Sequence, residues 1–332
     1  MSVPLIDIAP LVQGADDDDA TRRVAAELGR ACIEHGFFYV IGHGVDGALI
    51  ERLLSACHEF FALPIEQKLA VHMRHGGRAW RGYFSVGEEL TSGRPDQKEG
   101  LYFGSELAPS HPRAGWPLHG QNLFPKEPPA LRSLVLDYMA ALTQLGHRLM
   151  AGMSLSLGLP ADYFQAHYTA DPTLLFRVFH YPGSDAQDPD SWGVGEHTDY
   201  GLLTLLYQDE VGGLAIKKDG EWLSAPPIPG SFVCNIGDML ERMTFGRYRS
   251  TPHRVRNVSG RSRLSLPFFF DPGWDSTLQP IPAALLSHTQ QPSGTLDRWD
   301  GQDIHAYRGT YGDYLLAKVS KVFPALMGEV RG

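Results

Sequence analysis

The sequence has 332 residues, of which 43% are hydrophobic and 20% are charged, a balance typical of a globular protein and unlike that of a disordered chain or a coiled coil. It carries 29 Lys and Arg against 38 Asp and Glu, a formal net charge of −9 without a long basic run, so we expect no nucleic-acid partner. No apolar stretch approaches the roughly 18 residues of a membrane-spanning helix, so we expect no membrane partner either.

The cysteines and the first residues bear on the cellular compartment. Cys32, Cys57 and Cys234 form no C-x-x-C pair and leave an odd count, which predicts buried, reduced thiols. The first residues lack the basic and apolar regions of a signal peptide. Both features predict a cytoplasmic protein.

Helices and a buried strand are predicted for the first third of the chain. Apolar residues at helical spacing predict a helix over residues 21–35, which Gly36 would end as a C-cap glycine. The aromatic run 36–41 predicts a buried strand, and a second amphipathic pattern predicts a helix over 48–61. Pro64 can then start a short helix at its first position.

A glycine motif lies between the predicted strand and the second helix. Gly42-His-Gly44-Val-Asp-Gly47 fits the G-x-G-x-x-G pattern of dinucleotide-binding folds. Such a fold needs a second parallel strand directly after the helix, and the sequence that follows is not strand-like. We therefore interpret the motif as a turn.

The rest of the chain changes from helix to strand. Residues 71–125 are rich in Gly, Pro and aromatics and predict loops and short strands, and 129–157 predict a long helix. A last helix is predicted over 312–323. Between these helices, short apolar runs separated by Gly and Pro predict strands over 174–181, 201–207, 214–217, 231–236, 253–258 and 263–270. Strands of this length and spacing are typical of a sandwich or a barrel.

One histidine–aspartate pair is the strongest chemical signal. His197 and Asp199 are two residues apart, and in a strand such side chains point to the same face. By itself the pair is weak evidence, because the chain has 14 histidines. With His253 from a neighbouring strand it would form a two-histidine, one-carboxylate facial triad, the ligand set of non-haem Fe(II) oxygenases. Zinc is the competing metal, although the hydrolase motif H-E-x-x-H is absent.

A second pair follows ten residues after His253. Arg263 and Ser265 are also two apart in a predicted strand and would face the same way. A guanidinium can bind one carboxylate through a bidentate pair, and the hydroxyl can add a further hydrogen bond. The pair could therefore hold one end of a dicarboxylate whose other end chelates the metal.

Several further motifs accompany these residues. They are Val3-Pro-Leu-Ile-Asp-Ile8, Gly36-Phe-Phe-Tyr-Val-Ile-Gly-His-Gly44, Phe60-Phe-Ala-Leu-Pro64, Arg81-Gly-Tyr83, Asp96-Gln-Lys-Glu99, His180-Tyr-Pro182, Gly195-Glu-His-Thr-Asp-Tyr-Gly201, Ser250-Thr-Pro-His-Arg254, Arg263-Leu-Ser-Leu-Pro-Phe-Phe269 and Tyr311-Gly-Asp-Tyr314. With them, nearly the whole chain resembles the isopenicillin N synthase-like family of Fe(II)- and 2-oxoglutarate-dependent oxygenases.

The resemblance implies a fold and a domain organisation. We expect an α+β fold with a double-stranded β-helix, or jelly roll, as its core and helices on its flanks. Residues 1–125 would form the N-terminal helical and β region of the family, packed on the core. Residues 126–332 would form the jelly-roll oxygenase domain with its long supporting helix and its C-terminal helix.

The resemblance also implies the roles of the site residues. His197, Asp199 and His253 would hold Fe(II), and Arg263 with Ser265 would bind the distal carboxylate of 2-oxoglutarate. Tyr181 matches a tyrosine that often helps to bind this co-substrate. Two positions before Tyr181, where many plant members have asparagine, stands Phe179, which makes the pocket more apolar.

The implied reaction is the oxidation of a small molecule by O₂, most often hydroxylation, with release of succinate and CO₂. Within the family, isopenicillin N synthase and the plant cyclopropane-carboxylate oxidase use the triad without 2-oxoglutarate, and Arg263 could then hold a substrate carboxylate. An ethylene-forming activity on 2-oxoglutarate is a further alternative. An idle ligand-binding protein or a zinc hydrolase are alternatives of a different class.

The substrate itself is not indicated by the sequence. Aromatic residues near the metal strands are candidates for the pocket and would favour a small, partly apolar molecule. They are Tyr83, Tyr102, Phe179, Phe268 and Phe270, each of which could equally belong to the core. Arg81, Lys98 or Arg177 could bind a substrate carboxylate, with a surface or structural role as the alternative.

Overall fold

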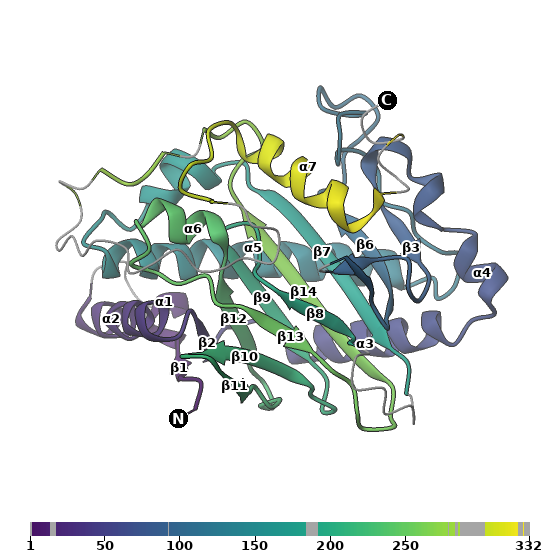
Figure 1. The fold of residues 1–332 in the computed structure, drawn as a ribbon, viewed down its shortest axis with the longest axis horizontal. Coiled ribbons are helices and arrows are strands. Elements are labelled where there is room, and N and C mark those ends of the chain that lie inside the picture. The colour runs from purple at the N-terminus through teal and green to yellow at the C-terminus, as the bar shows by residue number, and fades with distance from the viewer. Residues whose placement is uncertain are drawn as a thin grey trace.

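The computed structural model consists of two facing β-sheets with helices on both sides (Figure 1). It describes residues 2–13, 18–91, 93–183, 192–277, 279–282, 285, 303–324 and 328. Apart from one hairpin within the small sheet, the strands of the second half alternate between a large sheet and a small one. This is the double-stranded β-helix that the resemblance to the family implies.

The large sheet has eight strands. In spatial order they are β1 (Leu5–Asp7), β2 (Phe37–Ile41), β12 (Phe232–Ile236), β9 (Leu203–Gln208), β14 (Arg263–Asp271), β7 (Thr173–Tyr181), β6 (Glu99–Gly104) and β3 (Gly82–Phe84). Strands from the first 125 residues therefore extend both edges of the sheet that the second half forms.

The small sheet lies over the large one and has four strands. Their order is β11 (Glu221–Ser224), β10 (Leu214–Lys218), β13 (His253–Val255) and β8 (Val194–His197). A separate hairpin pairs β4 (Leu90–Thr91) with β5 (Arg94–Pro95). The predicted strand over 253–258 ends early, because the register between β13 and β8 shifts between His253 and Val255.

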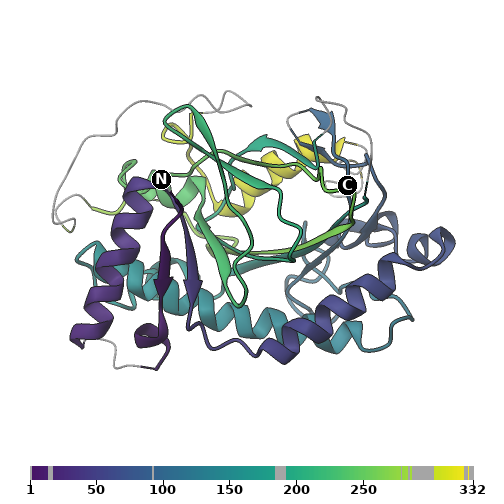
Figure 2. The ribbon, with the colours of Figure 1, turned by 90° about the horizontal axis from the view of Figure 1, so that it is seen from below.

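Three helices cover the outer face of the large sheet (Figure 2). They are α2 (Asp19–Glu34), α3 (Gly47–Phe61) and α5 (Leu131–Ser156), and each matches a predicted helix within three residues. Their apolar stripes drive this packing, because burial removes apolar surface from water. The shorter helices are α1 (Ala9–Gln13), α4 (Ile65–Leu69), α6 (Asp238–Met243), two 3₁₀ turns at Met73–His75 and Gly77–Ala79, and a π turn at Gln165–Thr169.

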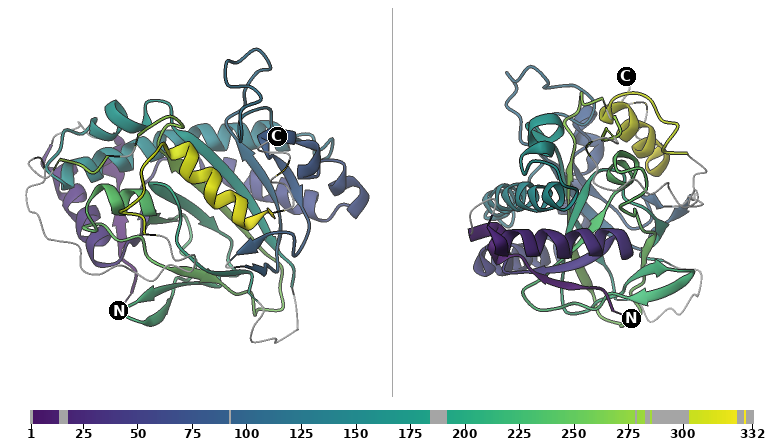
Figure 3. Two further views of the ribbon diagram at one scale, coloured as in Figure 1. Left: turned by 45° about the horizontal axis from the view of Figure 1, so that its top comes forward. Right: turned by 90° about the vertical axis from the view of Figure 1, so that its left-hand side faces the viewer.

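The last helix, α7 (Tyr311–Val322), lies on the opposite side of the molecule from α5 (Figure 3). A capping box starts it: Thr310 accepts a hydrogen bond from the backbone of Asp313, whose carboxylate in turn accepts one from the backbone of Thr310. Phe323, directly after the helix, packs edge-on against Trp80 and Phe84 at ring-centroid distances of 5.1 and 5.6 Å. Phe323 thereby fixes the C-terminal end of the helix against residues of the first third of the chain.

Side chains alternate between the two faces of β7 and β14, and this alternation defines the site. Odd-numbered residues, such as Arg263 and Phe269, line cavities between the sheets. Even-numbered residues point towards α5, where the ring of Phe270 packs against His147 and that of Phe176 against Tyr138. One face of each strand therefore builds the core and the other builds the site.

Glycines make the predicted turns near the N-terminal edge. Gly36 ends α2 with φ +65°, and a Cβ at this position would lie 2.2 Å from the carbonyl oxygen of Arg249. Gly42 and Gly44, also with positive φ, connect β2 to α3 as the turn that we expected. The cysteines are buried free thiols, and none of the described helices is long and apolar enough to cross a membrane.

Candidate active site

Three side chains converge between the sheets. His197 ends β8 and His253 begins β13, and the two residues are direct partners in the antiparallel register. Each histidine Nε2 lies 3.7 Å from Oδ1 of Asp199. The possible ligand atoms of all three lie within 4.8 Å of one another. The structure thus brings together the three residues that the sequence singled out.

Asp199 reaches this position in a different way from the one expected. Strand β8 ends at His197, so that Asp199 lies in the connection between β8 and β9 and not on the strand itself. Its side chain is held there by Oδ2, which accepts hydrogen bonds from Thr204 at 2.5 Å and from Asn235 at 2.7 Å. Oδ1 is left to face the histidines.

Backbone carbonyl groups orient both imidazole rings. Nδ1 of His197 lies 2.8 Å from the carbonyl oxygen of Gly195, and Nδ1 of His253 lies 3.2 Å from that of Thr251. An Nδ1–H that donates to these oxygens leaves the Nε2 lone pair directed at the centre of the triad. Since a carbonyl oxygen can only accept, these contacts favour the tautomer that a metal ligand needs.

The protonation states also suit a metal site. Burial and the neighbouring His197 lower the pKa of His253 to about 4, against the opposing effect of Asp199, so that its ring is neutral at neutral pH. Burial alone would raise the pKa of Asp199, but the two histidines and the hydrogen bonds from Asn235 and Thr204 outweigh it and lower that pKa. A neutral imidazole and an ionised carboxylate are the forms that bind a divalent cation.

An unsatisfied arginine lies near the triad. Arg263 is completely buried, and its Nη2 donates to Gln208 at 3.1 Å, whereas Nε and Nη1 have no hydrogen-bond partner among the described residues. Its guanidinium lies 4.7 Å from the ring centroid of Tyr181. Ser265 follows on the same face of β14, and all three side chains line one cavity. A buried cation with two free donors fits a carboxylate ligand.

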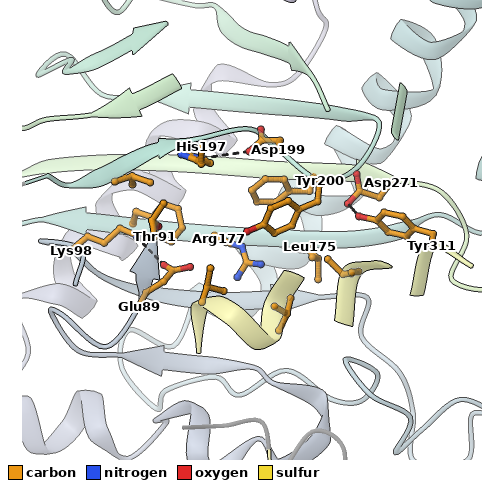
Figure 4. A pocket seen from close by; sticks show the side chains of 16 residues that line it. Glu89, Thr91, Lys98, Leu175, Arg177, His197, Asp199, Tyr200, Asp271 and Tyr311 are labelled. Carbon is orange, nitrogen blue, oxygen red and sulfur yellow. Dashed lines mark hydrogen bonds and ion pairs between the residues drawn. The ribbon is translucent and has the colours of Figure 1, made fainter. Parts of the chain in front are cut away.

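Two cavities meet at the triad. The first is lined by Arg263, Ser265, Tyr181 and all three triad residues, and we call it the co-substrate cavity. The second, which we call the outer cavity, is lined by His197 and Asp199 and extends towards α7 (Figure 4). Phe179, Val194 and Phe269 line both. A metal at the triad would therefore be reached from two sides.

Only one of the five predicted pocket aromatics lines these cavities. Phe179 does so, between the two. Phe268 and Phe270 lie on the even-numbered face of β14 that packs towards α5, so their assignment was wrong by one residue, and Phe269 takes the place expected of them. Tyr83 and Tyr102 are buried behind the cavities, where their hydroxyl groups donate to Glu99 and Glu89.

Sequence reasoning missed several residues of the site. Asn235 and Thr204 orient Asp199, and Tyr200, Asp271 and Tyr311 line the outer cavity. The alternation of side chains along a strand could have identified Phe269 and Asp271. Arg263 and Ser265 already indicate that the odd-numbered residues of β14 face the cavities. No spacing in the sequence indicates that Asn235, which is 36 residues from Asp199, would bind it.

Comparison with family models gives two matches. A model described as "2OG-Fe(II) oxygenase superfamily" matches residues 172–272, which include the triad and Arg263. A model described as "non-haem dioxygenase in morphine synthesis N-terminal" matches residues 3–127.

Comparison with curated proteins gives relatives along nearly the whole chain. A probable iron/ascorbate oxidoreductase of Dictyostelium discoideum is 46% identical and covers 99% of this chain and 96% of its own. A 1-aminocyclopropane-1-carboxylate oxidase of Dictyostelium mucoroides is 41% identical, with 97% and 95% covered. A homoarginine-6-hydroxylase of Oryza sativa subsp. japonica is 38% identical, with 96% of each chain covered.

Comparison with solved structures also gives similar proteins along nearly the whole chain. A full-length protein of Neurospora crassa, solved in complex with alpha-KG (2-oxoglutarate), has a TM-score of 0.78 at 27% identity, with 96% of each chain covered. A dioxygenase for auxin oxidation in rice has a TM-score of 0.71 at 26% identity, with 99% of each chain covered.

Proposed function

Because the chain belongs to the 2OG-Fe(II) oxygenase superfamily, we propose that it hydroxylates a small molecule at a centre held by its own His197, Asp199 and His253. As a member it is a non-haem oxidoreductase with Fe(II) as its metal and 2-oxoglutarate and O₂ as co-substrates. The proposed reaction converts R–H, 2-oxoglutarate and O₂ into R–OH, succinate and CO₂.

In this proposal, one group of residues binds the metal and another binds 2-oxoglutarate. When bound, Fe(II) and 2-oxoglutarate would supply the oxidising power for the hydroxylation of a C–H bond. His197 and His253 offer Nε2 and Asp199 offers Oδ1, and the opposite edges of these groups are held by hydrogen bonds that keep the donors in place. Arg263, Ser265 and Tyr181 hold the far carboxylate of 2-oxoglutarate.

The observation that carries the 2-oxoglutarate assignment is the pair of unpaired donors on Arg263. Leaving a buried charged donor without a partner costs free energy, so a buried guanidinium with free Nε and Nη1 implies an anionic ligand at that place. Ser265 and the three triad residues line the same cavity. A dicarboxylate that also chelates the metal satisfies both ends.

The test is the visible charge-transfer band of the Fe(II)–2-oxoglutarate chelate, recorded without oxygen. We expect the band in the wild type and, at the same 2-oxoglutarate concentration, a strong loss in Arg263→Gln. Arg261→Gln is the matched control, because Arg261 is two residues away but exposed and paired with Glu210. An unchanged band in Arg263→Gln would refute the role of Arg263.

A second candidate function is oxidation without 2-oxoglutarate. The 41% identity to a 1-aminocyclopropane-1-carboxylate oxidase favours it, and Arg263 would then hold a carboxylate of the primary substrate. Fe(II) binding without a charge-transfer band, and product formation without succinate, would support this candidate. Succinate formed in equal amount to hydroxylated product would support the first.

The domain organisation is part of the proposal. We propose that residues 1–125 are the N-terminal region and residues 126–332 the oxygenase domain, with the site residues named above all in the second. Support comes from the two family models, which match 3–127 and 172–272.

A further inference from the structure

The outer cavity contains an arginine of its own. Arg177 lies on β7, two residues before Phe179, and faces the inner side of the large sheet. Figure 4 shows its guanidinium among the side chains that line the cavity. Arg263 lies in the other cavity, and the triad lies between the two. Each side of the metal centre therefore has one arginine.

Arg177 has aromatic neighbours where a carboxylate partner would be expected. Its guanidinium carbon lies 3.5 Å from the ring centroid of Tyr102, 5.4 Å from that of Phe269 and 5.5 Å from that of Trp80. Within the described parts of the chain, no carboxylate oxygen lies within 4.0 Å of its nitrogens. The rings fix the plane of the group, and stacking leaves its N–H edges available to a ligand.

Of the other two cations that the sequence proposed for this role, Lys98 is already paired and Arg81 does not line the outer cavity. Lys98 is buried and forms ion pairs with Asp96 and, at 2.8 Å, with Glu89. Arg81 is buried and donates to the carbonyl oxygen of Leu118 at 2.8 Å. Arg177 is thus the lining cation of the outer cavity that has no ion pair in the described structure.

The remaining lining limits the size and character of a ligand. The outer cavity has a volume of about 80 Å³, and three aliphatic side chains of α7 close one side of it. They are Leu315, Val319 and Val322. Leu175 and Phe269 add further apolar surface. The carboxylates that also line the cavity have partners of their own. Glu89 pairs with Lys98, Asp199 accepts from Asn235 and Asp271 accepts from Tyr311. The cavity therefore suits a small molecule with an apolar part and an anionic group that reaches Arg177.

We propose that the primary substrate is a small carboxylic acid whose carboxylate pairs with Arg177 in the outer cavity. The inference rests on the proposed oxygenase function and adds the substrate class. Bidentate pairing with a fixed guanidinium would set which carbon faces the metal, because the ligand is held at its charged end. An uncharged analogue of the same shape would leave the guanidinium without its partner.

The alternative role for Arg177 is structural. Glu89, which lines the cavity, shares Lys98 with Asp96. Burial opposes the ionisation of Glu89, but the charges of Lys98 and Arg177 lower its pKa. If this were its whole role, Arg177→Gln would change stability but would not distinguish an acid from its amide. The experiment therefore compares the two ligands in the same variant.

The experiment measures succinate release with pairs of carboxylic acids and their primary amides. The pairs include L-homoarginine, 1-aminocyclopropane-1-carboxylic acid and aliphatic and aromatic acids of similar size. We expect turnover of acids, with kcat/KM about 10- to 100-fold lower for each matched amide. In Arg177→Gln the KM for the acid should rise about as much, the acid and its amide should become similar, and Arg177→Lys should recover part of the loss.

Two readouts separate a local effect from a damaged fold. The charge-transfer band and the KM for 2-oxoglutarate should stay unchanged in Arg177→Gln, because Arg177 does not line the co-substrate cavity. Arg132→Gln is the charge-matched control, since Arg132 is exposed and pairs with Glu106 at the start of α5. It should match the wild type in every assay.

Three results would overturn the proposal while the proposed function stands. The first is a substrate without an acidic group that is turned over as well as any acid. The second is an equal loss for acid and amide in Arg177→Gln. The third is a normal charge-transfer band with no turnover of any acid in the panel. A wild type without the band would instead refute the proposed function, and this inference with it.

Discussion

At the scale of single residues, the side chains behind the metal ligands decide how well the ligands are placed. Asn235 donates to Oδ2 of Asp199 from the neighbouring strand β12, and Thr204 does so from β9. Together they leave Oδ1 to the metal. Because both residues bind Oδ2, we expect them to act by orienting the carboxylate.

We predict that Asn235→Ala lowers the affinity for Fe(II) about 10- to 100-fold, because Asp199 loses one of the two donors that fix its carboxylate. The measurement is an anaerobic Fe(II) titration. Asn122→Ala is the control, since Asn122 is also a buried amide but binds Gly104 and Glu106, away from the site. Equal Fe(II) affinity in wild type and Asn235→Ala would contradict the prediction.

Asp271 makes stability depend on pH in a defined direction. Burial raises its pKa from 3.8 to about 7, and its carboxyl group contacts the hydroxyl group of Tyr311 and the backbone N–H of Leu202. A group whose pKa is raised on folding stabilises the folded state at low pH. This contribution is present below about pH 4 and is lost as the pH rises towards 7.

We therefore predict that Asp271→Asn stabilises the metal-free protein relative to wild type as the pH rises from 5 to 8, by about 3 kcal/mol over this range. The amide oxygen can accept from Leu202, the amide NH2 can donate to the hydroxyl oxygen of Tyr311, and the side chain has no charge to bury. Urea unfolding of both proteins at pH 5 and pH 8 measures the difference. A difference between them that does not change with pH would show that Asp271 is already ionised at pH 5.

At the scale of elements, α7 determines the outer cavity. Leu315, Val319 and Val322 form one wall of it, and Phe323 anchors the end of the helix against Trp80 and Phe84. The N-terminal end is anchored by Tyr311, whose hydroxyl group donates to Asp271 on β14. The wall is thus held at both ends by contacts with other elements.

We predict that Phe323→Ala lowers the free energy of unfolding by about 3 kcal/mol, because a buried aromatic ring leaves a cavity. The looser wall should also let 2-oxoglutarate be consumed without substrate oxidation, so that succinate exceeds hydroxylated product. Thermal melting and the succinate-to-product ratio measure the two effects. Val258→Ala, at a side chain that is 69% exposed, should change neither.

The elements show what could and could not be predicted from the sequence. Helical periodicity located α2, α3, α5 and α7, because one apolar stripe of each faces a sheet or its helix neighbours. The short strands β8 and β11 were not predicted, since runs of four residues carry too little pattern. The sequence also predicted Asp199 as part of a strand, whereas a turn and two distant donors place it.

The site was predicted where it depends on local spacing. A spacing of two residues identified both pairs, His197 with Asp199 and Arg263 with Ser265. The aromatics of the pocket were not found, because a one-residue shift in a strand moves every side chain to the other face. Phe268 and Phe270 therefore belong to the face towards α5, and Phe269 to the cavities.

At the scale of the whole molecule, the N-terminal region completes the sheet of the core. Strands β1 and β2 continue it beyond β12, and β6 and β3 continue it beyond β7. Gly36, at the end of α2, also lies against the carbonyl oxygen of Arg249, close to the strand that begins with His253. Without residues 1–125, both edges of the large sheet would lose their hydrogen-bond partners.

We predict that residues 126–332 expressed alone neither unfold cooperatively nor bind Fe(II) with wild-type affinity. The two exposed strand edges and the uncovered apolar surface should favour aggregation. Chemical unfolding and Fe(II) titration measure this, and co-expression with residues 1–125 should restore both properties if the pieces associate. A fragment that binds Fe(II) as the full chain does would show that the core is independent.

The alternation along β7 and β14 has a consequence for how such a protein can diverge. The even positions, such as Phe176 and Phe270, hold the sheet to α5, whereas the odd positions, such as Arg177 and Phe269, meet the ligands. A substitution at an odd position changes what enters the cavity and leaves the contacts with α5 untouched. Substitutions on the cavity side of a strand can therefore change which substrate binds, while selection for folding preserves the side chains that face α5.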